Sequence, residues 1–473
     1  MSNIDFSVTS DLENLISQTK FERIFFLCGK KKKSYYSSNG YRTIKKILKK
    51  KTTKFYFKSS LFPEIVELKK IIVSLKQFSP DLIIAIGGGT VIDYAKIANC
   101  VGVEKNLEKK IINNSYILKH KLAKLIAIPT TAGSGAEVTA NAVIYINKIK
   151  YSVESELVKP DYFFLIPEFV MGASKKIISS AGFDAIAQAV ESLISKKSNL
   201  ASVRFAKKSL KISLKYYLDF LSKPTKENSS AMCLAANLSG KAISISKTTA
   251  PHAISYPFTS FYNIKHGHAV SLTFEKFMKF NYLNYNKSDC NFNLKKRYED
   301  IFSIFKVTDI NDFENFIINL KKKANLESDF AKLKIDLSND FDKIVKGWSE
   351  YWEIYNKKAI FRELRKKADE LLDDLNEENY SEDNFLITIS MNLSFKISTG
   401  ENITTESIES FPYLIALVDK KNNIIVKKKL DFSFKNISVM DTFILEEDKI
   451  NIRIPNIDID KKNARLLIGF INR

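Results

Sequence analysis

The spacing of apolar and polar positions changes twice along the chain, and each change predicts a different kind of structure. Up to about residue 165, short apolar runs rich in β-branched and aromatic residues alternate with amphipathic stretches, which is the pattern of βα units and a parallel sheet. The expected strands are Arg23–Cys28, Lys54–Lys58, Leu82–Ile86, Lys124–Ile128 and Tyr162–Ile166.

From about Ser174 the apolar residues recur at i, i+3 and i+4, as between Ala185 and Leu193, which indicates helices. Signals for strands return only near residue 385, after an acidic stretch between residues 369 and 383. The alternation there predicts a small antiparallel domain, most simply a sandwich. Its expected strands are Phe385–Ile397, Tyr413–Val418, Ile424–Leu430, Lys449–Ile454 and Ala464–Phe470.

These patterns predict an α/β plus all-α protein with an appended small β domain. We expect a Rossmann-like nucleotide-binding domain over residues 1–170, a helical domain over 171–376, and the antiparallel β domain, of unassigned role, over 385–473. A chain of 473 residues with 45% hydrophobic content is long enough to bury a large core and to form several domains.

The composition argues against a membrane protein, a disulfide-rich protein and a nucleic-acid-binding protein. We expect a cytoplasmic protein without membrane insertion, because no leader-like start and no run of roughly 18 apolar residues is seen. The four cysteines lack C-x-x-C spacing, which argues against a disulfide framework or a thiolate zinc site. The net charge is +21, but the lysines are spread along the chain, so we expect no nucleic-acid partner and instead a small anionic substrate or cofactor.

Two segments have the character of a nucleotide site. Gly87, Gly88 and Gly89 follow a buried strand and lead into a helix, where absent side chains let a pyrophosphate approach the backbone amides. A tight structural turn would have a similar sequence. A second strand ends in the small and hydroxyl-bearing residues 129–137, at the sheet edge where ligands of open α/β sheets bind.

A metal site is the second chemical hypothesis. Three of the four histidines fall within residues 252–268, and imidazole is a common ligand of catalytic divalent metals. Asp184 and Gln188 lie one turn apart on one helix face, so that with His252 and His266 they could place four side chains around an ion. Hydrogen-bonded core histidines and a capping or ion-paired aspartate are the alternatives.

The ordered motifs G-G-G-T-x-x-D-x-A-K, P-T-T-A-G-S-G-A-E, G-F-D-A and H-x(13)-H-G closely resemble the iron-containing (group III) alcohol dehydrogenases, over about residues 10–375. The resemblance implies a Rossmann-like domain and a dehydroquinate synthase-like helical domain, with NAD(P)H and a divalent metal, Fe²⁺ or Zn²⁺, in the cleft between them. A homodimer is compatible with this description.

The resemblance also implies roles for individual residues. The residues matched to the nucleotide site are Gly87, Gly88, Gly89, Thr90, Asp93, Thr130, Thr131 and Ser134. Asp184, His252 and His266 match three metal ligands, but Gln188 and Tyr256 stand where the family has histidines. Because an amide oxygen is a weaker donor than imidazole, we expect a weakly held ion. His252 and His266 are also the expected catalytic residues. From its closeness to them in the sequence, and not from the resemblance, His268 is a candidate for the proton donor, with water as the alternative.

Around the histidines, residues 240–257 and 266–270 are most similar to the phosphonoacetaldehyde reductase branch of the family, which implies reduction of phosphonoacetaldehyde to 2-hydroxyethylphosphonate. Lys247, Thr248, Thr249 and Lys265 could then hold the phosphonate, or the lysines could be solvated surface charges. Reduction of another small aldehyde or a sugar-derived ketone is one alternative. A degenerate dehydrogenase scaffold that serves as a binding module is the other.

The end of the first strand predicts the choice of nucleotide. NAD-preferring members of the family carry an aspartate there, whereas this chain has Gly29 followed by Lys30 and three further lysines. Without a carboxylate to repel the 2′-phosphate of the adenosine ribose, NADPH is expected over NADH. A solvated lysine loop is the alternative.

Overall fold

The fold is described from a computed structural model. The structure describes residues 12, 15–16, 21–29, 51–102, 106–118 and 120–336, together with the strands within 385–470. The chain divides into two compact units, residues 1–356 and 357–473. The first unit holds both the predicted Rossmann-like domain and the described part of the predicted helical domain, so the proposed boundary between them remains a prediction.

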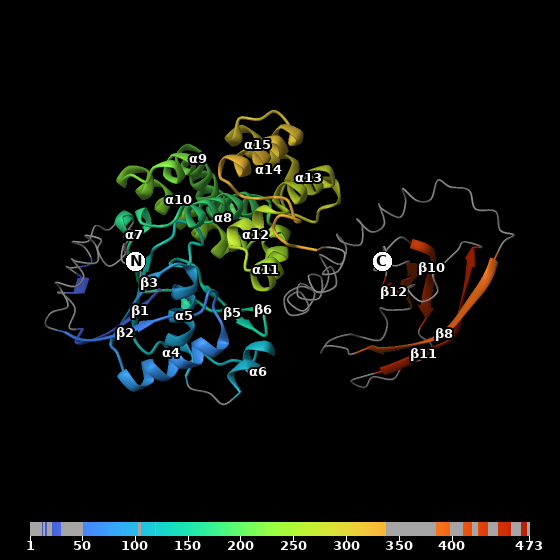
Figure 1. The fold of residues 1–473 in the computed structure, drawn as a ribbon, viewed down its shortest axis with the longest axis horizontal. Coiled ribbons are helices and arrows are strands. Elements are labelled where there is room, and N and C mark those ends of the chain that lie inside the picture. Colours follow the sequence, from blue (N-terminus) through green and yellow to red (C-terminus); the bar gives the residue numbers. More distant parts are fainter. Residues whose placement is uncertain are drawn as a thin grey trace. The chain divides into compact units, whose positions relative to one another are not determined.

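A five-stranded parallel sheet forms the centre of the first half of this unit (Figure 1). Its strand order is β2-β1-β3-β4-β7. The strands are β1 Arg23–Cys28, β2 Thr52–Phe57, β3 Leu82–Gly87, β4 Lys124–Pro129 and β7 Tyr162–Phe163. The chain adds β2 on one side of β1 and all later strands on the other, so the winding direction reverses between β1 and β3. Ligands of open α/β sheets bind at the carboxyl edge of the sheet beside such a reversal.

Both faces of the sheet are covered, which explains why its strands are apolar at nearly every position. Alternate side chains such as Phe25 and Ile83 pack on one face, against helices α4 Ile65–Phe78, α5 Gly89–Cys100 and α6 Leu107–Ile112. The other set of side chains meets Leu12, Ile16 and Phe169, the last from α7 Pro167–Met171. The expected strands are confirmed, although β2 begins two residues earlier and β7 is shorter than predicted.

A hairpin outside the main sheet was missing from the prediction. Its strands, β5 Asn141–Ile146 and β6 Ile149–Glu154, pair in antiparallel register. Between them Asn147 and Lys148 both have positive φ, 51° and 67°. This is the backbone that a two-residue hairpin turn requires. The hairpin lies between α5 and the helical half of the unit, and it therefore reaches both sides of the candidate site.

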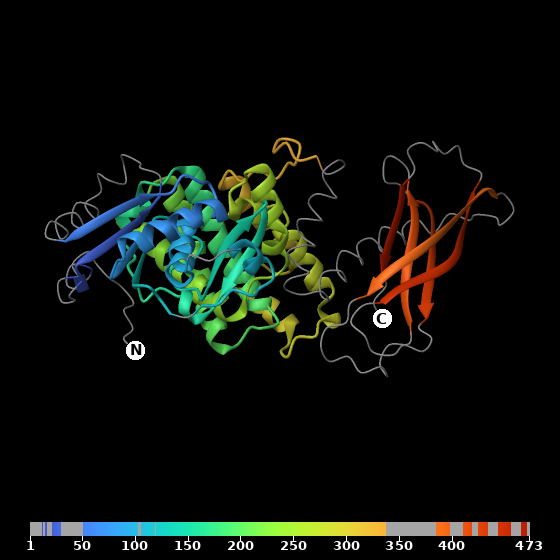
Figure 2. The same cartoon turned by 90° about the horizontal axis from the view of Figure 1, so that it is seen from below.

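The second half of the unit is helical, as predicted (Figure 2), and the long helix α8 contributes much of its apolar core. Although α8 is long and apolar enough to span a membrane, most of it is buried, as in the core helix of a folded domain. Its neighbours share one apolar core. The helices are α8 Lys175–Ile194, α9 Leu200–Ser222, α10 Lys226–Ser246, α11 Ala250–Tyr262, α12 His266–Ser271, α13 Phe274–Leu283, α14 Leu294–Phe305 and α15 Ile310–Lys323.

The second unit contains two antiparallel sheets, β10-β9-β12 and β11-β8. Its strands are β8 Phe385–Ile397, β9 Ser410–Val418, β10 Ile424–Ser433, β11 Phe443–Pro455 and β12 Arg465–Phe470. Each overlaps a strand predicted from the alternation of the sequence, which confirms the appended β domain. The expected helical-domain limit at residue 376 lies outside the described residues.

Candidate functional site

The glycine turn after β3 and the loop after β4 form one surface. The backbone N–H of Thr130 donates to the carbonyl of Gly87, with an N···O distance of 3.0 Å. A Cβ on Gly88 would lie 3.3 Å from Thr131 Oγ1, and one on Gly89 would lie 2.9 Å from Ser134 Oγ. The structure therefore brings together the two segments predicted to bind the nucleotide, with the hydroxyl groups of the second directly above the backbone of the first.

Helix α5 starts from this turn. Gly88 is its N-cap residue and Thr90 lies in its first turn, where the unpaired amides and the helix dipole favour an anion. Gly29, at the end of β1, donates its N–H to the carbonyl of Ile86 and has open space where a side chain would project. Lys30 and the rest of its lysine run lie outside the described residues.

Asp93 is oriented differently from the residues of the turn. Its carboxylate accepts a backbone hydrogen bond from Val143 in the hairpin, and burial raises its pKa to about 6 against the opposing charges of Lys96 and Lys150. Asp93 therefore contacts the hairpin beside the nucleotide surface, and its predicted contact with the pyrophosphate remains untested.

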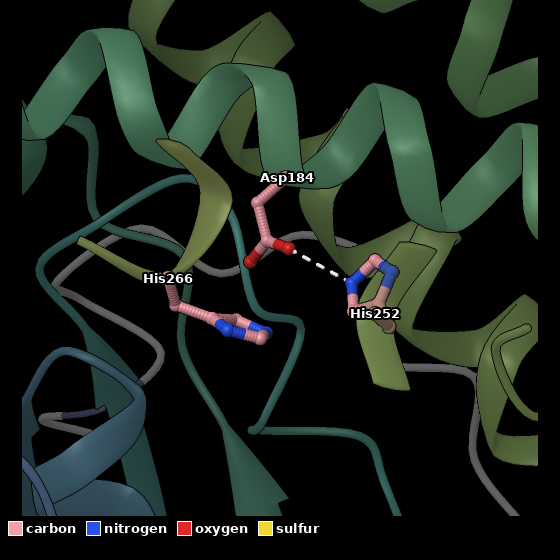
Figure 3. Close-up of side chains that lie close together, drawn as sticks. All are labelled: Asp184, His252 and His266. Atoms are coloured by element: carbon pink, nitrogen blue, oxygen red, sulfur yellow. Dashed lines mark hydrogen bonds and ion pairs between the residues drawn. The ribbon is translucent and has the colours of Figure 1, made fainter. Parts of the chain in front are cut away.

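A second cluster joins three helices (Figure 3). Asp184 comes from α8, His252 from α11 and His266 from α12, and one ligand atom from each lies within 4.8 Å of the others. His252 Nε2 lies 3.1 Å from Asp184 Oδ1. One carboxylate and two imidazoles are a donor set suited to a divalent ion such as Fe²⁺ or Zn²⁺. The residues present therefore fit the metal that the sequence predicts.

The remaining nitrogen of His252 is held by a residue that the sequence reasoning did not assign. Glu191, two turns after Asp184 on α8, is fully buried and is hydrogen-bonded to His252 Nδ1. The other oxygen of the same carboxylate accepts from the backbone N–H and the hydroxyl of Thr249. A carboxylate behind a ligating histidine fixes the orientation of the ring and increases its basicity.

The charges around His252 favour a cation at this position. Burial alone would lower the pKa of His252, but Glu191 and Asp184 together raise it to about 10. Burial would likewise raise the pKa of Asp184, but the hydrogen bond from His252 and the charge of His266 hold it below its usual range. In contrast, burial lowers the pKa of His266 to about 4. The buried carboxylate of Asp184 therefore faces the position of a cation directly, and the buried carboxylate of Glu191 acts on it through His252.

Glycine at position 267 lets α12 approach α8 closely enough for His266 to join the cluster. A Cβ there would lie 2.0 Å from the carbonyl oxygen of Ser180 and 2.7 Å from Asp184 Cβ. A similar contact links the two halves of the unit at Gly135, which has a φ of 59° and would place a Cβ 2.4 Å from Gly240 Cα in α10. Direct backbone contacts thus set the spacing between the nucleotide loop, α10 and α8.

Gln188 stands beside Asp184 but does not offer its oxygen to the cluster. Its carbonyl oxygen accepts from the hydroxyl of Ser239 at 3.0 Å, while its amide group donates a hydrogen bond to Asp184. Rotation of the amide by 180° would exchange these roles. The role of Gln188 as a ligand remains a prediction, and its geometry here is that of a residue that orients Asp184.

The structure does not bring His268 to the cluster. Two residues apart on α12, His266 and His268 project on opposite sides of the helix. His268 Nε2 lies 2.7 Å from the carbonyl oxygen of Glu327, and its backbone N–H donates to Ser180 Oγ. The position of His268 therefore does not support its expected role as proton donor.

The predicted phosphonate-binding residues lie at the entrance to α11 and α12. Lys247 forms an ion pair with Glu154 at 2.9 Å, with both side chains partly exposed. Thr248 and Lys265, the residue before α12, are half-buried. The hydroxyl of Thr249 is engaged by Glu191, so it positions His252 rather than a phosphonate. The substrate roles of Lys247, Thr248 and Lys265 remain predictions.

Both halves of the unit match known families. Residues 6–167 match the model of the iron-containing alcohol dehydrogenases, and residues 178–363 match that of the C-terminal part of Fe-containing alcohol dehydrogenases. The chain belongs to the iron-containing alcohol dehydrogenase family. The family membership and the donor set of the cluster agree on a divalent metal, with NAD(P)H as the second cofactor.

The chain is similar to two curated relatives over part of their length. It is 29% identical over 218 residues to a phosphonoacetaldehyde reductase of Streptomyces viridochromogenes, covering 44% of this chain and 55% of the relative. It is 30% identical over 217 residues to a 4-hydroxybutyrate dehydrogenase of Clostridium kluyveri, covering 45% and 58%. The matched region thus spans slightly more than half the length of each relative.

Solved structures confirm the fold. A sulfoacetaldehyde reductase from Bifidobacterium kashiwanohense in complex with NAD⁺ superposes with a TM-score of 0.64 at 23% identity, covering 72% of this chain and 89% of that one. An alcohol dehydrogenase from Oenococcus oeni gives 0.63 at 20% identity, covering 72% and 90%. The likeness supports a Rossmann-like half and a helical half in one unit.

Proposed function

We propose that this protein reduces a small anionic aldehyde with NAD(P)H in a metal-assisted reaction, with phosphonoacetaldehyde as substrate and 2-hydroxyethylphosphonate as product. The cluster of Asp184, His252 and His266 is the observation that carries the proposal. A carboxylate-backed histidine beside a second carboxylate and a second histidine is a costly arrangement in a protein interior unless a cation is bound there. Membership of the alcohol dehydrogenase family supports the reaction class.

Each group of residues has a separate task in this proposal. Asp184, His252 and His266 would hold the ion, and Glu191 would keep His252 in the orientation that directs Nε2 at the site. The glycine turn and the first amides of α5 would bind the pyrophosphate, and the loop at Thr130 to Ser134 would lie beside the nicotinamide. When bound, the ion would supply a Lewis acid for the aldehyde oxygen, and the reduced nicotinamide would supply a hydride.

The choice of substrate is supported by the curated relatives. One is named for a phosphonate-bearing aldehyde and the other for a carboxylate-bearing alcohol, so both names describe a small molecule with an anionic group. The net charge of this chain, +21, would attract such an anion through its electrostatic field. The four cysteines are free thiols, which supports the cytoplasm as the proposed location.

The decisive experiment measures NADPH oxidation by the purified full-length protein in metal-replete buffer. We expect kcat/KM for phosphonoacetaldehyde to exceed that for propionaldehyde by on the order of 10². Oxidation of 4-hydroxybutyrate with NADP⁺ tests the carboxylate alternative in the same assay. Equal efficiency on the charged and neutral aldehydes would reject the phosphonate substrate. Absence of turnover with every substrate in a protein that binds metal would instead support a non-catalytic scaffold.

A further inference from the structure

Helix α12, which carries His266, has only six residues. A helix of this length is not stable by itself, so contacts with other elements hold it in place. On the side that faces α8, Gly267 packs against the backbone of Ser180, and Ser180 Oγ accepts the backbone N–H of His268 at 3.1 Å. The opposite side of α12 is held by a different part of the chain.

One continuous stretch, residues 321–335 at the end of α15 and after it, contacts all three helices that carry the candidate metal ligands. Its contact with α8 is a hydrogen bond from Ser179 Oγ to the carbonyl oxygen of Ala324. Its contact with α11 is made by the ring of Phe330, which stacks on Phe258 with ring centroids 5.9 Å apart. We call this stretch the clamp segment.

The clamp segment contacts α12 at two points. At the end of the helix, Lys321 Nζ donates to the carbonyl oxygen of Ser271 at 3.1 Å and forms a buried ion pair with Glu275 at 2.8 Å. In the first turn, His268 Nε2 lies 2.7 Å from the carbonyl oxygen of Glu327. The clamp segment therefore fixes both the start and the end of the helix that carries a candidate ligand.

The ring of His268 is buried and projects to the side of α12 opposite His266. A neutral imidazole has one N–H group, which at Nε2 donates to the carbonyl oxygen of Glu327. The turn that presents this carbonyl is itself fixed, because Glu327 Oε1 accepts from the backbone N–H groups of Ser328 and Asp329 at 2.9 Å. His268 thus ties α12 to an ordered turn on the far side of the helix from the metal cluster.

We propose that His268 is a positioning residue, whose hydrogen bond to Glu327 holds α12 against the clamp segment and so keeps His266 at the metal cluster. This inference rests on the proposed function in one respect, namely that the cluster binds a divalent ion. It gives His268 a task that needs a hydrogen-bond donor and no proton transfer.

The test compares His268→Leu, which removes the donor, with His268→Gln, whose longer amide can donate to the same carbonyl. His268→Asn repeats the test with an amide that is one carbon too short, should His268→Leu fail to fold. Ser209→Ala is the matched control, because it removes another buried hydrogen bond to a backbone carbonyl, that of Ala235, between α9 and α10.

Three quantities are measured on the full-length protein. Hydrogen exchange of the α12 amides in metal-free protein, followed by mass spectrometry, reports whether the helix is held in place. The dissociation constant for Zn²⁺, measured by competition with a chelator, reports whether the ligands remain together. Turnover at limiting and at excess metal, with the ion that supports wild-type activity, separates loss of metal from loss of a proton donor.

For His268→Leu we expect the α12 amides to exchange on the order of tenfold faster and the affinity for Zn²⁺ to fall on the order of tenfold, as for the loss of one buried hydrogen bond behind a ligand. Its turnover should fall at limiting metal and recover in excess metal. His268→Gln should restore most of the exchange protection and the affinity, and Ser209→Ala should match wild type in both.

Wild-type exchange and affinity in a folded His268→Leu protein would overturn the positioning role. Turnover that stays low in excess metal while α12 remains protected would also overturn it, and would identify His268 as a proton donor. A wild-type protein that binds no Zn²⁺ and no Fe²⁺ would contradict the proposed function, whereas the exchange of the α12 amides would still decide whether His268 holds the helix.

Discussion

Glu191 is hydrogen-bonded to Nδ1 of His252, so the ring presents Nε2 to Asp184. The two residues come from different helices, α8 and α11, and Thr249 at the start of α11 is bound to the same carboxylate. Glu191 thus positions both the imidazole and the helix that carries it. Its effect on a bound ion should be larger than its distance from the ion would suggest.

Replacing Glu191 by glutamine should weaken metal binding by on the order of 10- to 100-fold, because the amide cannot supply the negative charge that supports His252. The dissociation constant can be measured by competition with a chelator. Glu67→Gln is the matched control, since Glu67 is also buried and hydrogen-bonded, to Tyr56, but lies in the sheet half of the unit. Unchanged affinity in Glu191→Gln would show that Glu191 only packs the interface of α8 and α11.

Removing one imidazole should reduce metal binding more than Glu191→Gln does. His266→Ala should abolish most bound metal and most activity in metal-replete buffer, because the donors that remain leave little affinity in reserve. His120→Ala serves as the control, since His120 is exposed. Metal content by elemental analysis and turnover with NADPH give two independent readouts. Wild-type values of both in His266→Ala would contradict the assignment of His266 as a ligand.

Adding one methyl group at position 267 tests whether the metal site needs the close approach of α12 to α8. Gly267→Ala should lower metal affinity by at least about tenfold, because its Cβ would meet the carbonyl of Ser180 and would displace His266 from Asp184. The control is Gly102→Ala, at a position with no atom within 4 Å of the new Cβ. Circular dichroism establishes whether each variant is folded. A folded Gly267→Ala protein with wild-type metal affinity would show that α12 can shift without loss of the site.

Nucleotide preference depends on the end of β1. We expect NADPH to be favoured over NADH by on the order of tenfold, one or two screened phosphate contacts being worth roughly 1 to 3 kcal/mol. Gly29→Asp should lower or reverse the ratio of kcat/KM values, and the open space at this position can accommodate the new side chain. Gly102→Asp adds the same charge elsewhere and should leave the ratio unchanged. A wild-type preference for NADH would show that this edge does not face the ribose.

Stability should depend strongly on Lys96. This side chain is fully buried between Thr139 and Asn141 and close to the buried Glu137, whose pKa burial raises. Lys96→Met should reduce the free energy of unfolding by about 3 to 5 kcal/mol, because buried carboxylates lose their cation. Lys69→Met removes a partly exposed ion pair with Glu108 and should cost less than about 1 kcal/mol. Urea denaturation measures the free energy of unfolding of both variants. A similar decrease in Lys96→Met and Lys69→Met would contradict the special importance of Lys96.

The sheet, the change to helices and the three side chains that cluster could be predicted from the sequence, because each is marked by a short stretch of neighbouring residues. Apolar runs mark strands buried on both faces, and the motifs around Asp184, His252 and His266 are compact. The hairpin β5–β6 was missed although its first strand is a short run of apolar and aromatic residues, Ala142 to Ile146, that ends at Asn147 in the turn.

Residues whose roles depend on tertiary contacts were not predicted. Glu191 is a carboxylate in an otherwise apolar helix, which is a usable signal, but its partner lies 61 positions away in the sequence. The burial of Lys150 follows from the register of β6 and from its contact with the ring of Tyr256 in α11, and neither can be read from local spacing. Conversely, the closeness of His268 to His266 in sequence suggested a shared site, whereas the geometry of a helix directs the two rings apart.

The contact between Gly135 and Gly240 has a mechanical consequence. Where two backbones touch without intervening side chains, neither can move by changing a rotamer, so a displacement of α10 is transmitted directly to the loop that carries Thr131 and Ser134. The loop therefore shares the rigidity of the helical core. Much of the ordering that a nucleotide would otherwise have to impose on this loop is completed when the chain folds, which favours binding with a small loss of conformational entropy.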